Sequence, residues 1–234
     1  MTGRFDGVAF DLDGTLYPNY RLYIRLIPFM CREHRLLRAL GKARNILRAQ
    51  ARAQTLATEE GFYTLQARLM GQILRQDPQV VQQRVETLIY RGWEPLFKEI
   101  ALFPQVRETL IALRDRGIKL GLLSDFPPVV KLEHLRLTGL WDQVLCSEEV
   151  GQLKPDRTPF LALARQLDLP AARILYVGNS VAYDIIGAKN AGMKAALIAP
   201  PFACLPRLRR PGAHNGRADF VYGHYRQLYD YVVG

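Results

Sequence analysis

The chain has 234 residues with a formal net charge of +10, and 49% of them are hydrophobic, which is enough for a globular protein with a sizeable core. No apolar run approaches the ~20 residues that a membrane span needs, and the N-terminus lacks an apolar leader, so we expect neither a span nor a signal peptide. The three cysteines, at Cys31, Cys146 and Cys204, are too few and too far apart for a disulfide framework or a metal cluster, which predicts a reduced, cytoplasmic protein.

A short apolar strand at Val8–Phe10 comes first, and an unusually helical stretch follows it. Residues 16 to 95 are rich in Leu, Ala, Arg and Gln, with little turn chemistry, which predicts three or four helices and no strand. Thirteen of the Arg and Lys residues and only six of the Asp and Glu residues fall in this stretch. The sequence therefore predicts a core formed by residues 1–16 and 96–234, with an inserted helical subdomain at 17–95.

After Pro95, predicted helices and strands alternate regularly. The helices are expected at 104–116, 127–137, 158–167 and 184–191, and the strands at 118–124, 143–147, 173–178 and 194–199. A Pro- and Arg-rich loop at 200–217 precedes a last edge strand at 219–222 and a short helix to 231. This alternation predicts an α/β fold: a Rossmann-like parallel sheet covered on both faces, with right-handed connections.

Polar side chains follow four of the predicted strands, at the ends where an open parallel sheet binds its ligands. In chain order they are Asp11 and Asp13, Ser124 and Asp125, Lys154, and Asn179 with Asp184. Each has a plainer interpretation alone: a turn, a helix cap, a solvated lysine, or an acid at a helix start. Together they place carboxylates, a hydroxyl and a lysine at one edge, which suits phosphoryl transfer with a cation that offsets the repulsion between carboxylates.

The motifs DLDGT, LLSDF, VGQLKPD and VGNSVAYDIIGA resemble, in order and spacing, the four signature motifs of the haloacid dehalogenase-like (HAD) hydrolase superfamily. The resemblance covers Phe5–Leu16 and Leu96–Ala199. The inserted helices resemble the C1-type cap of that superfamily in position and helical character only.

The resemblance implies a role for each motif residue. Asp11 would be the nucleophile that forms an aspartyl-phosphate, and Asp13 would be the general acid and base. Ser124 would donate a hydrogen bond to a phosphoryl oxygen, while Lys154 would neutralise the nucleophile and the phosphoryl charge. Thr15 would hold the first motif loop. The phosphate-binding residues implied in this way are Thr15, Ser124, Asp125 and Lys154.

The resemblance also implies Mg²⁺ as the cofactor, because the ligands would all be oxygens. They would be Asp11, Asp13 through its backbone carbonyl, Asn179 and Asp184. Two positions depart from the family pattern. Asp125 stands where an Asn or a small residue is more usual, and its charge would repel phosphate unless it points away. Asn179 stands where an Asp is usual, which removes one negative charge from the metal site.

These residues favour a Mg²⁺-dependent phosphatase that hydrolyses a small phosphorylated metabolite. Asp13 supports this hypothesis, because dehalogenases of the superfamily lack an acid two residues after the nucleophile. The inserted helices would then form a mobile lid, hinged near 16–18 and 93–95. Two alternatives stay open: phosphoglycomutase-like phosphoryl transfer, and a weakly catalytic relative that binds phosphates or a protein partner.

The arginine-rich segment from Arg21 to Arg52 has a further interpretation, since basic and apolar residues together are typical of nucleic-acid or membrane surfaces. The apolar residues are needed for the insert's own core, however, and a solvated helical face is the favoured explanation of the charge. We therefore expect a small phosphorylated substrate as partner, with no membrane and no nucleic acid, and the oligomeric state stays open.

Overall fold

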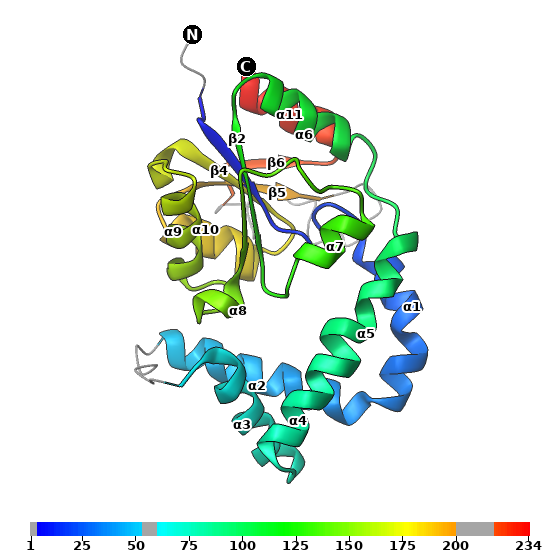
Figure 1. The fold of residues 1–234 in the computed structure, drawn as a ribbon. Helices are drawn as coiled ribbons and strands as arrows, with labels where there is room; N and C mark the ends of the chain where they lie inside the picture. Colours follow the sequence, from blue (N-terminus) through cyan, green and yellow to red (C-terminus); the bar gives the residue numbers. More distant parts are fainter. Residues whose placement is uncertain (1–3, 53–59, 200–217) are drawn as a thin grey trace.

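A six-stranded parallel sheet forms the centre of the computed structural model, which describes residues 4–52, 60–199 and 218–234 (Figure 1). The strand order is β3-β2-β1-β4-β5-β6. The strands are β1 (Gly7–Phe10), β2 (Lys119–Ser124), β3 (Gln143–Cys146), β4 (Ile174–Gly178), β5 (Lys194–Ile198) and β6 (Phe220–Tyr222). This sheet confirms the predicted Rossmann-like α/β fold class. The predicted loop at 200–217, with Cys204, lies outside the described residues.

Helices cover both faces of the sheet, because its strands are apolar on both sides. In β1, Val8 and Phe10 pack into the cluster on one face, whereas Ala9 packs into the cluster on the other. The first face is covered by α6 (Val106–Asp115), α7 (Val129–His134) and α11 (Tyr225–Val233). The second is covered by α9 (Arg157–Gln166) and α10 (Ile186–Asn190), which lie across the sheet from α6 and α11 in Figure 1.

The predicted elements differ from the structure mainly at their ends. The helix expected from 184 begins earlier, with the π-helical turn η4 (Val181–Ile185), because the hydroxyl of Ser180 accepts a hydrogen bond from the N–H of Tyr183 and caps it. The helix expected to end at 137 stops at His134, before Arg136 in the left-handed region. Two short elements were not predicted, α8 (Ser147–Val150) and the 3₁₀ turn η3 (Ala171–Arg173).

Between β1 and α6, the described residues of the inserted segment form helices and no strand, as the sequence predicts. The first three helices are α1 (Asn19–Arg32), α2 (His34–Arg52) and α3 (Phe62–Leu74). A fourth helical run comprises α4 (Pro78–Val85), the π-helical η1 (Glu86–Tyr90) and α5 (Arg91–Trp93), and the 3₁₀ helix η2 (Glu94–Glu99) follows. Among the described residues, none of these helices is long and apolar enough to span a membrane.

The helical segment has a core of its own and lies off one end of the sheet (Figure 1). Its core is formed by Leu36, Leu40, Met70, Val81, Val85 and Ile89 with two alanines. Leu153, in the loop before α9, packs against Leu47, Phe62 and Leu65 of the segment. The helices therefore contact the loop that carries Lys154 directly.

Candidate active site

Asp11 follows β1, a central strand of the sheet, with β2 and β3 on one side of it and β4, β5 and β6 on the other. Strand β1 pairs with β2 on one side and β4 on the other, so the loops after these three strands converge. The N–H of Asp11 still donates to the carbonyl of Val177 in β4, at 2.9 Å, which keeps the residue in the sheet's register. Asp11 therefore lies at the crevice where open α/β sheets bind their ligands.

A single lysine joins two of the predicted acids. The ammonium of Lys154 donates to Asp11 Oδ1 and to Asp184 Oδ1, each at 2.7 Å, and all three side chains are buried. The hydroxyl of Thr15 donates to the other oxygen of Asp11, also at 2.7 Å. The structure thus brings these four sequence-predicted residues into one hydrogen-bonded group.

Burial and charge act against each other in this group. Burial raises the pKa of Asp11 to about 7, the charge of Lys154 opposes the rise, and those of Asp184 and Asp13 add to it. For Lys154, burial alone would lower the pKa, but the two neighbouring carboxylates raise it well above its usual value. The lysine is therefore charged, and any further cation beside Asp11 would favour the ionised carboxylate.

Two glycines let the motif loops approach one another closely. A Cβ on Gly178, the last residue of β4, would lie 2.3 Å from Cβ of Asp184. Asp184 occupies this position because its Oδ2 accepts the N–H groups of Asn179 and Ser180, at 3.1 and 2.9 Å. Gly14 has a φ of 90°, and a Cβ there would lie 2.1 Å from the amide nitrogen of Asn179. The amide of Asn179 thus lies against the first motif loop.

Asp13 is held by two residues that the sequence interpretation did not assign. The ammonium of Lys131, in α7, donates to both carboxylate oxygens of Asp13 at 3.1 and 2.8 Å. The hydroxyl of Tyr17 also donates to this carboxylate. Lys131 lies in the helix that follows the second motif but is 118 residues from Asp13, so no local spacing in the sequence signals this contact.

Ser124, the last residue of β2, and Asp125, the residue after it, have different partners. Ser124 is fully buried, and its Oγ accepts the N–H of Phe126 at 3.1 Å. This bond closes a local turn and does not cap the next helix, because α7 begins at Val129 and its N-cap residue is Pro128. Asp125 points toward cations: Oδ1 accepts the N–H of Lys154 at 3.1 Å, and Oδ2 accepts from Arg48 at 2.9 Å. Burial alone would raise the pKa of Asp125, but Lys154, Arg44 and Arg48 outweigh it and hold that pKa below its usual value.

Two arginines of α2 are not on a solvated face, so the favoured explanation of the arginine-rich segment is wrong for them. Arg44 is buried and donates to the carbonyl of Asp125 at 2.9 Å and to the carboxylate of Glu148. Only 14% of the Arg48 side chain is exposed. Local periodicity indicated that these positions lie on a helix, but it carried no signal for the partners they face.

A cavity of about 350 Å³ contains most of the predicted site. From the strand ends it is lined by Asp11, Asp13, Asp125, Lys154, Asn179 and Asp184. From the helical segment it is lined by Asn19, Leu22, Tyr23 and Trp93. Among the described residues, no three His, Cys, Asp or Glu side chains form a metal cluster. The carboxylates of Asp11 and Asp184 and the amide oxygen of Asn179 are nevertheless the hard oxygen ligands that Mg²⁺ prefers, so these residues fit that ion.

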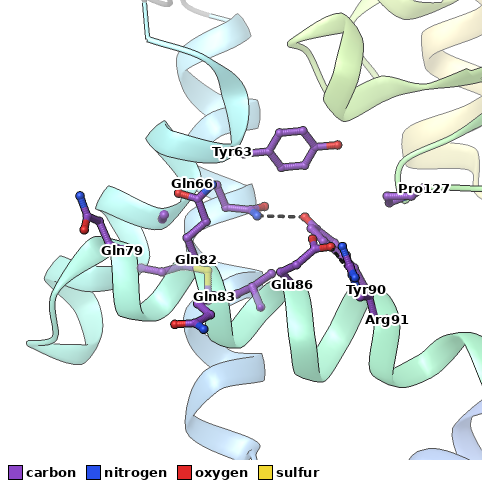
Figure 2. Close-up of a pocket in the computed structure, with 12 residues that line it drawn as sticks. Tyr63, Gln66, Gln79, Gln82, Gln83, Glu86, Tyr90, Arg91 and Pro127 are labelled. Atoms are coloured by element: carbon purple, nitrogen blue, oxygen red, sulfur yellow. Dashed lines mark hydrogen bonds and ion pairs between the residues drawn. The ribbon is translucent and has the colours of Figure 1, made fainter.

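A second cavity, of about 590 Å³, is lined by residues of the helical segment and by Pro127 of the core (Figure 2). It shares no lining residue with the first. On its wall Gln66 donates to the hydroxyl of Tyr90 at 3.1 Å, the bond drawn between them in Figure 2. Tyr90 in turn donates to Glu148 at 2.9 Å, so this wall connects to the core through the acid that Arg44 also contacts. None of the motif residues lines this cavity.

Comparison with known proteins assigns the family. The model of the haloacid dehalogenase-like hydrolases matches residues 5–192, so the chain belongs to this family. It is 32% identical to the phosphoglycolate phosphatase of Escherichia coli (strain K12) over 203 residues, which is 80% of this chain and 78% of the relative. It is 34% identical to the ribulose-1,5-bisphosphate 5-phosphatase of Halopiger xanaduensis over 111 residues, but this match spans only 46% of either chain.

Among solved structures, the fold is similar to a HAD phosphatase from Thermococcus onnurineus, with a TM-score of 0.62 and 23% identity over 97% of both chains. That likeness concerns the fold alone. With the family model and the phosphatase relatives, the chain is a phosphoric monoester hydrolase of the HAD-like type.

Proposed function

We propose that the chain is a Mg²⁺-dependent phosphatase that hydrolyses a small phosphorylated metabolite through an aspartyl-phosphate on Asp11. The observation that carries this proposal is the pairing of Asp11 with Lys154 and Thr15 at a cavity that Asp11, Asp13 and Lys154 line. The phosphatase relatives support the same class of substrate, since phosphoglycolate and ribulose bisphosphate are both small phosphorylated metabolites.

In the first step, a carboxylate oxygen of Asp11 attacks phosphorus, and the bond from phosphorus to the leaving oxygen breaks. Asp13, in its protonated form, gives the leaving oxygen a proton. Lys154 and Ser124 bind the phosphoryl oxygens in this proposal, and the charge of Lys154 offsets the negative charge that gathers there. In the second step, Asp13 takes a proton from water, whose oxygen attacks phosphorus, and phosphate leaves Asp11 free.

In this proposal, Asp11, Asp184, Asn179 and the backbone carbonyl of Asp13 would hold Mg²⁺. When bound, the ion supplies positive charge beside the carboxylates and the phosphoryl oxygens. Asn179 would contribute an uncharged oxygen, so the site would hold Mg²⁺ with one negative charge fewer than with an aspartate at this position.

The segment at 17–95 is proposed to act as the cap over this site. Support comes from Leu22, Tyr23 and Trp93, which line the cavity together with Asp11 and Asp13. Closure of such a lid excludes bulk water from the reacting groups. Its movement about 16–18 and 93–95 stays a prediction.

Turnover of p-nitrophenyl phosphate, with MgCl₂ and then with excess EDTA, tests the proposal. We expect Mg²⁺-dependent release of phosphate from the wild type and none from Asp11→Asn. A panel that includes 2-phosphoglycolate and ribulose 1,5-bisphosphate would then rank substrates by kcat/KM. Phosphate release that Asp11→Asn retains, or that EDTA leaves unchanged, contradicts the proposed mechanism.

A further inference from the structure

A closed ring of hydrogen bonds surrounds the backbone of Lys154. Its N–H donates to Asp125 Oδ1 at 3.1 Å, and its carbonyl accepts from Nε of Arg48 at 2.9 Å. The ring closes because the same guanidinium donates to Asp125 Oδ2 at 2.9 Å. Both backbone polar groups of Lys154 are thus bound by one ion pair, whose members lie on the loop after β2 and on α2.

Neighbouring side chains hold the ring in place. The guanidinium of Arg48 stacks over the ring of Tyr183 at 4.5 Å from its centroid. Arg44 donates to the backbone carbonyl of Asp125 at 2.9 Å, so the acid is held through both its side chain and its main chain. Each side chain of the Arg48–Asp125 pair is only 14% exposed, and planar guanidinium groups form directional bonds of this kind.

We propose that Arg48 and Asp125 are positioning residues that fix Lys154 for catalysis, so that the helical segment completes the active site in the core. An ion pair of this burial adds little net stability, because desolvation offsets much of its attraction. Its bonds do define where the Lys154 backbone lies, and hence where its ammonium meets Asp11 and Asp184, at 2.7 Å from each. The inference rests on the proposed phosphatase function.

This role also accounts for the family departure at Asp125. A carboxylate there has two oxygens, and one binds the Lys154 N–H while the other binds Arg48. An amide at this position keeps one acceptor but replaces the charged partner of Arg48 with a neutral group. The negative charge of Asp125 is thus paired with the guanidinium of Arg48 from α2.

The test uses five variants of the full chain. Arg48→Met removes the guanidinium and keeps most of the side-chain volume, Asp125→Asn removes the charge at constant shape, and the double variant combines them. Arg38→Met is the matched control, because Arg38 is an exposed arginine of the same helix. Arg48→Lys serves as the conservative variant: its single ammonium can reach one of the two partners but lacks the fork that binds both.

Two measurements distinguish a positioning role of Arg48 and Asp125 from a purely structural one. The first is kcat and KM for p-nitrophenyl phosphate at saturating MgCl₂. We expect kcat to fall about 10–100-fold in Arg48→Met and Asp125→Asn, with a smaller change in KM, since displacing a reacting group by about 1 Å costs rate. The double variant should lose little more than the worse single variant, because both act through one ring. Arg48→Lys should recover part of the rate, and Arg38→Met should match the wild type.

The second readout is amide hydrogen exchange of the peptide spanning 150–157, measured without substrate. Faster exchange there in Arg48→Met, but not in Arg38→Met, is the expected result. An unchanged kcat in an active preparation of Arg48→Met overturns the inference, as does a fall in kcat with no change in this exchange. If the wild type turns over no phosphate ester, the proposed function fails, and unchanged exchange in Arg48→Met would then separately refute the ring.

Discussion

Replacing Gly178 with alanine tests whether the close approach of β4 to Asp184 matters for activity. The added Cβ would lie 2.3 Å from Cβ of Asp184 and 2.6 Å from its Oδ2, whereas ordinary contacts begin at 3.4 Å. One of the two must therefore move by about 1 Å, a strain that typically costs about 1–3 kcal/mol in a packed interior. Asp184 also accepts a hydrogen bond from Lys154, so a displacement of Asp184 would also shift Lys154, the partner of the proposed nucleophile Asp11.

We expect Gly178→Ala to fold with reduced stability and to lose about 100-fold in kcat, because a 1 Å misplacement of a reacting group costs about that much. Urea unfolding followed by tryptophan fluorescence measures the stability, and turnover of p-nitrophenyl phosphate with MgCl₂ measures the rate. Gly41→Ala is the matched control. Gly41 is exposed in α2 with no atom within 4 Å of an added Cβ, so alanine should stabilise the helix by about 0.5–1 kcal/mol.

The two glycines should therefore respond with opposite signs. A Gly178→Ala protein whose unfolding free energy stays within about 0.5 kcal/mol of the wild type, and whose kcat stays within twofold, would refute the reasoning. Such a result would mean that the loop after β4 relaxes without moving Asp184 away from Lys154.

Three further predictions concern the proposed chemistry. Asp11→Asn should abolish turnover while the circular dichroism spectrum is retained, since an amide cannot attack phosphorus, and near-normal activity would exclude an aspartyl-phosphate. Asp13→Ala should slow both steps by about 10²–10⁴-fold, with less effect on the first step for good leaving groups, and an equal loss across a leaving-group series would argue against the acid role. Asn179→Asp should lower the Mg²⁺ concentration for half-maximal activity, because it adds a negative charge to the site, and an unchanged requirement would place Asn179 away from the ion.

The sheet and the strand-end residues could be predicted from sequence for a simple physical reason. Buried parallel strands are short apolar runs, amphipathic helices repeat every 3.6 residues, and both signals are local. Since the carboxyl ends of parallel strands meet at one edge, residues as distant in sequence as Asp11, Lys154 and Asp184 were expected together, and the structure brings them within hydrogen-bonding distance. The roles assigned to them stay predictions.

Long-range partners were decided only by the tertiary structure. Arg48 and Asp125 are 77 residues apart, and Lys131 is 118 residues from Asp13, so no local spacing links either pair. From sequence, Asp125 was an unmatched negative charge and the arginines of α2 were an exposed basic face. The helical segment packs against the loop of Leu153, which brings α2 over the strand ends. The carboxylate of Asp125, which would be costly to bury alone, is thereby paired with Arg48. The sequence by itself determined which groups carry charge and on which elements they lie, whereas the packing between those elements decided which charges meet.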